Sequence, residues 1–455
     1  DAQESRGLGD VYKRQPLSKE DIHKIIDIEL KGLLKRVGEL GYHIQVSDAA
    51  KEFLTEKGYD PQYGARPLKR AIQKYLEDEL AEVIIKGDLP EGGTLYVDCD
   101  KETDKLKVKS KKLEAKSCFI KGETMEKIAV LTSGGDAPGM NAAIRSVIRM
   151  AGFLHCEIVG IHRGYSGLLE EDFRLLTNRD AGGIVLHGGT MLRTARCPAF
   201  FDEDNQKKGA QILKNHGIEG LIVIGGDGSV QGAAALSSLG IPTVTIPGTI
   251  DNDMHGTDET IGHDTAVNAV VGAVSRIRDT ASAHDRAAII EVMGRFAGNI
   301  ALDAGIACGA EYILVPEVPF SREKLARSLI GQMKEGRTNS IIICAEGADD
   351  GRALGDWLKE RTNIDICTTI LGFIQRGGRP SARDSILGSL LGAAAVKALL
   401  DGQITSLIGM NKGEIRILPY SEAAKEKKIF KKGFYTLAGI LGAAQEDGDI
   451  AESGL

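Results

Sequence analysis

The sequence predicts an α/β fold with mainly parallel sheets, preceded by a small α+β unit. From residue 125 onward, apolar runs of strand length alternate with helix-type segments. That alternation is typical of sheets that helices cover on both faces. Gly supplies 56 of the 455 residues, often in pairs at the ends of the apolar runs. Because glycine lets the backbone come close to a ligand, we expect ligand sites at the carboxyl ends of the strands.

Composition excludes several classes of protein. The chain has 57 Lys+Arg against 64 Asp+Glu, a net charge of −7, whereas nucleic-acid-binding domains usually concentrate basic residues on one face. No apolar run reaches the roughly 18 residues that a membrane span needs, and no secretory signal is recognisable at the start. The seven cysteines lack C-x-x-C spacing, which favours a reducing compartment over a disulfide framework. We therefore expect a cytoplasmic protein with neither a nucleic-acid nor a membrane partner.

Residues 1–124 carry three different patterns. Residues 1–15 lack apolar periodicity and are predicted to be unstructured; the stretch DVYKRQ resembles the translation of a transposase end sequence used in DNA-library adaptors, and a short natural tail is the alternative. Residues 113–124 are predicted to be a linker.

Residues 16–112 are predicted to form an α+β unit. The first helix follows Ser18; the second, at 49–57, is started by Ser47 and can end at a left-handed Gly58; the third runs from Pro67 to Gly87. Two strands are predicted after them, at 94–99 and 105–109.

The stretch GYDPQYGARPLKR at 58–70 closely resembles the C-terminal small subdomain of Clp-type AAA+ unfoldases. In that family the Arg of the Gly-Ala-Arg triplet reaches a nucleotide, and Arg66 is the matching residue. The chain contains no G-x-x-x-x-G-K-[ST] motif. The resemblance therefore predicts a fold and not an ATPase, and Arg66 is expected to be solvated or salt-bridged.

Met125 stands immediately before an apolar strand and looks like a natural start. Two interpretations stay open: two genes or fragments joined with their intervening DNA translated, or a real fusion protein. Beyond Met125, strands are predicted at 128–131, 158–161, 221–224, 243–246, 288–292, 312–315 and 340–344.

Three of these strands end in residues that suit phosphate chemistry. Strand 128–131 leads into TSGGDAPGMN and then a helix, so backbone N–H groups and a helix dipole can meet phosphate; a tight structural turn is the alternative. Strand 221–224 ends in GGDGS, where Asp227 can hold Mg²⁺ on polyphosphate oxygens or merely cap a helix. Strand 243–246 ends in PGTIDND, where two carboxylates suit a general base beside a metal-associated partner, or form a turn.

Together these strand ends, with GT at 189–190, TAR at 194–196, EVMGR at 291–295, PEV at 316–318 and QRGG at 375–378, closely resemble the phosphofructokinase family over residues 125–440. The resemblance implies two doubly wound, mainly parallel-sheet domains. Residues 125–262 with 376–425 would form the nucleotide-binding domain, and 263–375 with 426–445 the sugar-phosphate-binding domain. The implied glycolytic reaction is ATP-dependent phosphorylation of fructose 6-phosphate at its 1-hydroxyl. A kinase of another sugar phosphate, or a non-catalytic regulatory or interaction chain, is the alternative.

The resemblance also implies residue roles. Asp251 would be the general base, Arg295 and the Gly135 N–H would stabilise the transferring phosphoryl group together with Thr249, and Asp227 would hold Mg²⁺. Arg286 would reach the sugar 6-phosphate from a neighbouring subunit, so a homo-oligomer, a tetramer in the bacterial family, is expected. The implied nucleotide-binding set is Gly135, Arg196, Cys197, Gly226, Asp227, Gly228 and Ser229. The implied substrate-binding set is Thr249, Asp251, Asp253, Arg286, Met293, Gly294, Arg295, Glu346 and Arg376.

ATP is expected as donor because pyrophosphate-using members carry Asp where Gly228 stands and Lys in place of Gly248. An Asp at 228 would repel the nucleotide α-phosphate and fill its space.

Several positions depart from the family pattern. Cys367 and Phe373 stand where Arg and His are usual, which removes two donors to a sugar phosphate. Arg379 and Arg383 are extra cations that either compensate or are simply solvated. An effector site is implied at Arg145, Arg149, Arg278, Glu311 and Arg337, but Glu335 replaces a basic residue there, and its charge should weaken regulation by a phosphorylated effector.

Overall fold

The computed structural model describes residues 25, 26, 30, 43–58, 67–77, 94–100, 105–110, 125–423 and 428–442. The chain divides into two compact units, Asp1–Gly122 and Glu123–Leu455. Among the described residues, no helix is both long and apolar enough to cross a membrane.

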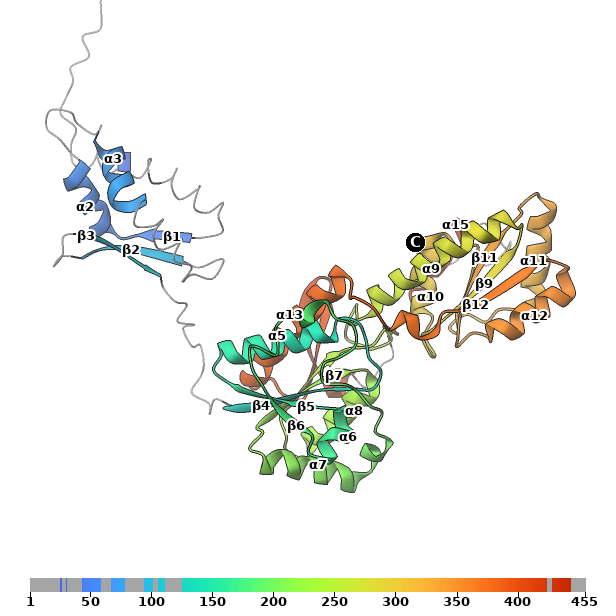
Figure 1. Cartoon of the computed structure of the whole chain (residues 1–455), viewed down its shortest axis with the longest axis horizontal. Coiled ribbons are helices and arrows are strands. Elements are labelled where there is room, and N and C mark those ends of the chain that lie inside the picture. Colours follow the sequence, from blue (N-terminus) through green and yellow to red (C-terminus); the bar gives the residue numbers. More distant parts are fainter. Residues whose placement is uncertain are drawn as a thin grey trace, which may run out of the picture. The chain divides into compact units, whose positions relative to one another are not determined.

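The first unit contains a three-stranded sheet with helices packed against it. Strand β2 (Thr94–Asp100) is central, parallel to β1 (His43–Val46) and antiparallel to β3 (Lys105–Ser110). Helices α2 (Asp48–Gly58) and α3 (Leu68–Ile72) and the π-helical turn Gln73–Glu77 follow β1 in the chain (Figure 1). Their shared core consists of Ile26, Leu30, Ala50, Phe53, Leu54, Leu68, Ile72, Leu76 and Val97.

Most sequence predictions that fall on described residues of this unit are confirmed. Ser47 caps α2, because its Oγ accepts a hydrogen bond from the Ala50 N–H at 3.1 Å, and both predicted strands are present. The prediction that Gly58 ends α2 in the left-handed conformation is wrong. Gly58 is the last residue of α2 without a positive φ, and an added Cβ would lie 2.9 Å from the Leu68 Cα. Glycine is needed there because α3 passes close by. Arg66 and residues 78–87 lie outside the described residues.

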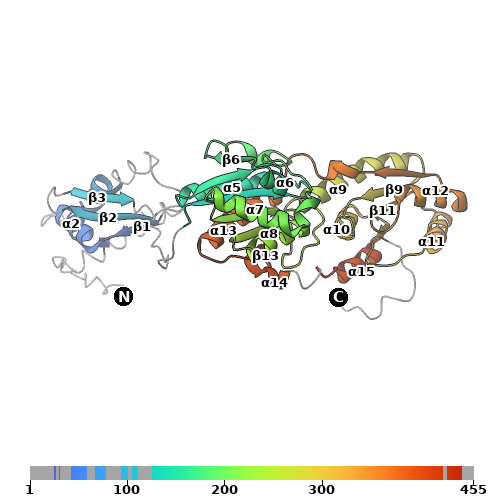
Figure 2. The same ribbon diagram turned by 90° about the horizontal axis from the view of Figure 1, so that it is seen from below.

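The second unit contains a seven-stranded sheet in the order β14-β13-β8-β7-β4-β5-β6. Its five inner strands are parallel, and the two edge strands, β6 and β14, run antiparallel to their neighbours. The strands are β4 (Lys127–Ser133), β5 (Glu157–Ile161), β6 (Phe173–Leu176), β7 (Gly220–Gly225), β8 (Thr243–Pro247), β13 (Ser406–Asn411) and β14 (Glu414–Pro419). Figure 2 shows β13 and the short helix α14 (Tyr420–Ala423) beside elements that come far earlier in the chain.

Helices cover both faces of this sheet. Alternate strand residues such as Ile128, Val130 and Ile222 pack under α5 (Met140–Phe153) and α13 (Ala382–Leu400). The residues between them, such as Ala129 and Leu131, face α6 (Gly164–Leu169), α7 (Glu203–Asn215) and α8 (Asp227–Ser238). The period of two follows from strand geometry, and it explains why the strands are apolar throughout.

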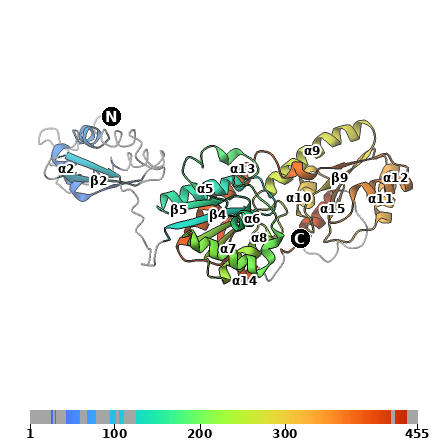
Figure 3. The same cartoon turned by 60° about the horizontal axis from the view of Figure 1, so that its bottom comes forward.

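A second sheet has four strands, all parallel, in the order β10-β11-β9-β12. They are β9 (Ala287–Val292), β10 (Tyr312–Leu314), β11 (Ser340–Ala345) and β12 (Ile366–Ile370). Helices α9 (His263–Ala283), α10 (Asn299–Cys308) and α15 (Lys432–Leu441) pack on one face, and α11 (Arg322–Lys334) and α12 (Gly351–Thr362) on the other (Figure 3).

The predicted α/β class with two doubly wound sheets is thus confirmed, and each of the seven predicted strands is present. The chain passes between the sheets before α9, between the 3₁₀ turn Gly372–Gln375 and α13, and again after α14. The segment 428–442 therefore returns to the second sheet, where the Tyr435 hydroxyl lies 3.3 Å from the Ile313 carbonyl oxygen.

Candidate active site

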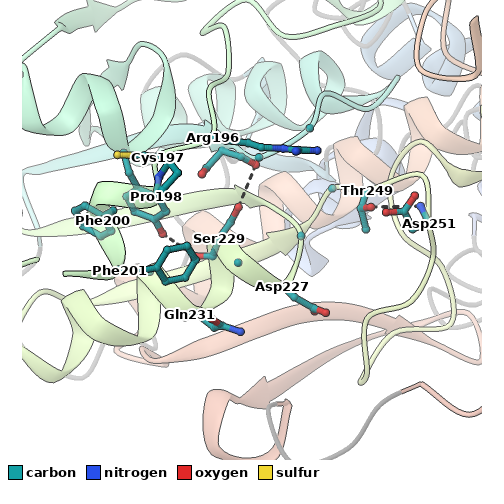
Figure 4. A pocket seen from close by; sticks show the side chains of 18 of the residues that line it. Arg196, Cys197, Pro198, Phe200, Phe201, Asp227, Ser229, Gln231, Thr249 and Asp251 are labelled. Atoms are coloured by element: carbon teal, nitrogen blue, oxygen red, sulfur yellow. Dashed lines mark hydrogen bonds between the residues drawn. The ribbon is translucent and has the colours of Figure 1, made fainter. Parts of the chain in front are cut away.

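The carboxyl ends of β4, β7 and β8 open onto a cavity of about 440 Å³ (Figure 4). The predicted residues that line it come from segments far apart in the chain. They are Gly135, Arg196, Cys197, Gly226, Asp227, Gly228, Ser229, Thr249, Asp251, Arg295 and Arg376. The structure therefore brings together all seven predicted nucleotide-binding residues and four further predicted substrate-binding or catalytic residues at one place.

The glycine turn after β4 is held by three other segments. Gly134 has a φ of 90°, its carbonyl oxygen accepts from the Thr194 Oγ1 at 3.0 Å, and the Ser133 carbonyl accepts from the Ser229 Oγ at 3.0 Å. An added Cβ on Gly135 would lie 2.5 Å from the Arg376 Nη1. Glycine at 135 thus allows the Arg376 guanidinium to lie directly against the loop.

Asp227 is the first residue of α8, and the N-cap position belongs to Gly226. The alternative interpretation of Asp227 as the helix cap is therefore wrong. Its exposed side chain lines the cavity at the positive end of a helix of 12 residues, where a helix dipole favours bound phosphate.

Asp251 lies at the floor of the cavity with only 3 % of its surface exposed. Its Oδ1 is buried and has no hydrogen-bond partner, and its backbone N–H donates to the Thr249 Oγ1 at 3.3 Å. Burial and the nearby Asp253 carboxylate raise the pKa of Asp251, and the guanidinium groups of Arg376 and Arg295 act against that rise. An unpartnered, buried carboxylate oxygen of this kind can accept a proton from a hydroxyl that enters the cavity.

Asp227, Asp251 and Asp253 form a cluster of negative charge. Burial raises the pKa of Asp253, and the Asp227 carboxylate raises it further. Among the described residues, no group of three or more His, Cys, Asp or Glu side chains is placed to hold a metal ion by itself. Mg²⁺ is usually bound by one or two carboxylates together with substrate phosphates, so these carboxylates fit an Mg²⁺ ion that arrives with a polyphosphate.

The turn after β9 presents Arg295 to the cavity. Arg295 adopts a φ of 54° and Gly294 a φ of 141°, and the Glu346 Oε1 accepts from the Arg295 N–H at 2.8 Å and the Gly294 N–H at 3.2 Å. The Gln375 Oε1 accepts from the Met293 N–H at 3.2 Å. Met293, Gly294 and Glu346 do not themselves line the cavity; Glu346 holds the backbone that carries Arg295.

Arg286 lies at the other end of β9 from Arg295. Its Nε is 2.6 Å from the Asp365 Oδ2, and the six residues of β9, at about 3.3 Å each, separate it from the turn by roughly 20 Å. Cys367 pairs in register with Ala288 at this same end. The structure does not bring Arg286 to the cavity of its own chain.

The positions that depart from the family pattern do not line the cavity either. Phe373 is 81 % exposed. Arg383 forms a bidentate ion pair with Glu259 and lines a different cavity, and Arg379 is exposed. The structure therefore gives no sign that Arg383 replaces the missing cations.

Three of the five predicted effector residues meet. The Glu311 Oε1 lies 3.1 Å from the Arg337 Nη1 and 3.5 Å from the Arg278 Nη1. Arg145 and Arg149 lie on α5 of the other sheet, and no contact joins them to this trio among the interactions of the described residues. Glu335 follows α11 as its exposed C-cap.

An aromatic wall at one end of the cavity, formed by Tyr165, Phe200 and Phe201, is not among the sequence predictions. Tyr165 and Phe200 stack with ring centroids 4.2 Å apart, Phe201 is 65 % exposed, and all three line the cavity. Figure 4 places Phe200 and Phe201 at one end and Thr249 and Asp251 at the other. The signal was the apolar CPAFF run directly after Arg196.

Comparisons with known proteins agree with this geometry. Residues 127–399 match the family model described as Phosphofructokinase, and residues 17–97 match the model of the C-terminal, D2-small domain of ClpB protein. The ATP-dependent 6-phosphofructokinase of Clostridium botulinum (strain Eklund 17B / Type B) is 49 % identical over 318 residues, 70 % of this chain and 99 % of the relative. That of Clostridioides difficile (strain 630) is 49 % identical over 317 residues, with the same shares of both chains.

Solved structures agree as well. Phosphofructokinase from Saccharomyces cerevisiae has a TM-score of 0.60 and 36 % identity, covering 70 % of this chain and 47 % of that chain, so this chain spans less than half of the yeast chain's length. A pyrophosphate-dependent phosphofructokinase from Marinobacter aquaeolei, at 23 % identity, covers 69 % of this chain and 88 % of that chain with a TM-score of 0.63, which shows likeness of fold. The chain belongs to the phosphofructokinase family, and the resemblance of its first unit to a Clp-type small subdomain is confirmed.

Proposed function

We propose that residues 125–442 catalyse ATP-dependent phosphorylation of fructose 6-phosphate at its 1-hydroxyl, giving fructose 1,6-bisphosphate and ADP. The observation that carries this proposal is the single cavity in which a glycine turn, a helix N-terminus with Asp227, and the buried Asp251 carboxylate lie together. Relatives 49 % identical over almost their whole length carry the name ATP-dependent 6-phosphofructokinase.

In this proposal Asp251 takes the proton of the 1-hydroxyl. Its unpartnered Oδ1 faces no competing donor, and its raised pKa makes it a better proton acceptor than an ordinary Asp, which favours general-base catalysis. Arg295 and the Gly135 N–H hold the transferring phosphoryl group, since such transfer depends mainly on positioning and charge stabilisation. Mg²⁺, held by Asp227, would neutralise charge on the polyphosphate tail.

The aromatic wall supports ATP as the donor. Phe201, which is exposed and lies beside Phe200 at the end of the cavity away from Asp251, offers apolar surface, where a nucleobase can bury apolar area. Pyrophosphate has no group that would use this surface.

The substrate assignment is tested with a coupled assay that compares fructose 6-phosphate with a panel of other sugar phosphates. Fructose 6-phosphate should give the highest kcat/KM with ATP. A far higher kcat/KM for another sugar phosphate would favour the second candidate, a kinase of different specificity. Cys367 and Phe373, which depart from the family pattern, are the reason to consider it. No turnover of any sugar phosphate would favour a regulatory or interaction role.

We also propose that the active unit is a homo-oligomer, a tetramer, in which Arg286 serves a neighbour's site. Because Arg286 lies roughly 20 Å along β9 from Arg295, it can contact the same sugar phosphate only from a second copy. The Glu311, Arg278 and Arg337 trio is proposed as one half of an effector site that Arg145 and Arg149 of another copy would complete. The six described cysteines are free thiols, which supports the proposed cytoplasmic location.

Residues 1–124 are expected to be dispensable for catalysis. Met125 packs against the core of the second unit, and the Glu126 N–H donates to the Glu219 carboxylate at 2.5 Å, so a chain that starts at Met125 keeps both contacts. Specific activity and oligomer mass of this truncated chain should match the full chain within about twofold, or exceed it. Loss of activity or of the oligomer would show that the first unit has a role in the enzyme.

The pH dependence of turnover should report the environment of Asp251. A base acts when deprotonated, so kcat/KM falls as the pH falls through its pKa. The pKa of Asp251 is raised first by burial and then by the Asp253 charge. Asp253→Asn removes this like charge and should lower the pKa of Asp251. The acid limb of the kcat/KM profile should then move to lower pH, even if the maximal kcat/KM changes. The exposed Asp279→Asn on α9 is the control and should not move it. An unmoved limb in Asp253→Asn, or a shift to higher pH, would contradict the assignment of the base.

A further inference from the structure

A second cavity, of about 640 Å³, lies on the other side of the loop that carries Asp251. Its lining comes mainly from three parts of the chain near the connections between the two sheets: residues between Asn252 and Val267, Arg383 and Asp384 at the start of α13, and residues between Lys428 and Phe434. Inside it, the Lys428 Nζ donates to the Asn252 Oδ1 at 2.6 Å and to the Asp258 carbonyl oxygen at 2.7 Å. One ammonium group therefore ties together both ends of the loop 252–258.

The first of these anchor points is the residue next to the proposed base. Asn252 is 2 % exposed and has a φ of 51°, a left-handed conformation that non-glycine residues seldom adopt without support. The Asn299 Nδ2 also donates to the carbonyl oxygens of Asp251 at 3.2 Å and of Asn252 at 3.0 Å. Asn299 thus holds the backbone of Asp251 and Asn252, and Lys428 holds the Asn252 side chain.

Lys428 lies in a strongly charged setting. Burial, and the nearby Lys431 ammonium, lower the pKa of Lys428 to about 8, while Asp258, Asp303 and Asp253 act in the opposite sense. His263, Glu259, Asp264, Asp384, Arg383 and Arg416 also line this cavity. A buried ammonium group is costly unless its hydrogen bonds are satisfied. Two of its donors are used on the loop beside Asp251, so its position and that of the loop are coupled.

We propose that Lys428 is a positioning residue for phosphoryl transfer: through Asn252 it fixes the backbone from which the Asp251 carboxylate projects into the active-site cavity. This inference rests on the proposed function, because it assumes that Asp251 acts on the substrate hydroxyl. It predicts an effect on kcat rather than on ATP binding, since Lys428 does not line the cavity that holds the predicted nucleotide-binding residues.

The test compares Lys428→Met with Lys431→Met in the full chain. Lys431 lies in the same segment and cavity, but its ammonium group contacts Asp303 at 3.6 Å and the Phe434 ring, not the loop. Lys428→Met should lower kcat about 10- to 100-fold, the cost of a catalytic group displaced by about 1 Å, with the KM for ATP nearly unchanged. Lys431→Met should stay within about threefold of the parent, and Lys428→Arg should recover part of the loss.

A double-mutant cycle separates positioning from general loss of structure. Asn252→Gly removes the side-chain acceptor of Lys428, leaves the Asp258 carbonyl oxygen and relaxes the positive φ, so it should fold. If Lys428 acts through Asn252, the double variant should have a kcat within about threefold of the worse single variant.

The inference is overturned if the losses of kcat in the two single variants multiply in the double variant. It is also overturned if Lys428→Met and Lys431→Met have the same kcat. Both comparisons require that the parent enzyme is active. An inactive parent would instead count against the proposed function, and the inference would fall with it.

Discussion

Asp251→Asn should lower kcat by about 10²–10⁴-fold, the usual contribution of a positioned general base, and leave ATP binding nearly unchanged. The substitution keeps the size of the side chain, so the floor of the cavity should keep its shape. It replaces the carboxylate, whose Oδ1 is buried without a hydrogen-bond partner, with a neutral amide that cannot serve as the proposed proton acceptor. The predicted nucleotide-binding residues lie on other loops of the cavity, from Gly135, Arg196 and the start of α8.

The measurement is kcat for fructose 6-phosphate with ATP at saturation, together with ATP affinity by calorimetry. Asp279→Asn, an exposed position on α9, controls for the loss of one negative charge from the protein. A kcat for Asp251→Asn within tenfold of the parent would remove Asp251 from the role of base.

Gly228→Asp should reduce kcat/KM for ATP by about 100-fold or more, because an unpaired like charge beside a polyphosphate costs several kcal/mol. The structure makes this a test of the ligand and not of folding. A Cβ at residue 228 meets only the Phe201 Cζ at 4.0 Å, so the new side chain has open space. Its carboxylate would stand in the cavity beside Asp227, where the nucleotide phosphates are proposed to bind.

Gly228→Ala is the matched control, since it adds the Cβ without the charge and should cost far less than Gly228→Asp. Turnover with pyrophosphate, measured for both variants, should fall less than turnover with ATP. Equal losses in the Ala and Asp variants would show that size alone matters at this position. Unchanged ATP kinetics in Gly228→Asp would show that residue 228 does not face the nucleotide.

Local pattern was enough to predict seven of the eleven strands described after Met125, but not β6, β12, β13 or β14. Three of the predicted strands, at 128–131, 221–224 and 243–246, are apolar runs that lead into glycine and Asp, and parallel strands bring such ends to one edge of the sheet. That is why Asp227 and Asp251 could be expected at the same cavity. The fold class followed from the same alternation of strands and helices.

The missed features depend on contacts between distant segments. Lys428 meets Asn252 across 176 positions of sequence, and no pattern near either residue signals that contact. Gly58 looks like a helix terminator, but the approach of Leu68 explains it. The structure adds a role for Glu346, predicted as a sugar contact, because the positive φ of Arg295 leaves backbone N–H groups that need an acceptor.

The order of strands in the larger sheet affects how this protein is made. Strand β8 ends at residue 247, and its neighbour β13 begins only at residue 406, after the whole of the second sheet. At synthesis rates of about 5–20 residues per second, one edge of β8 waits roughly 10–30 s on the ribosome for its partner. During that wait β8 is an open edge of apolar strand, the kind of surface that promotes aggregation. Soluble yield during expression should therefore depend on how quickly the inserted second sheet folds and lets β13 reach β8.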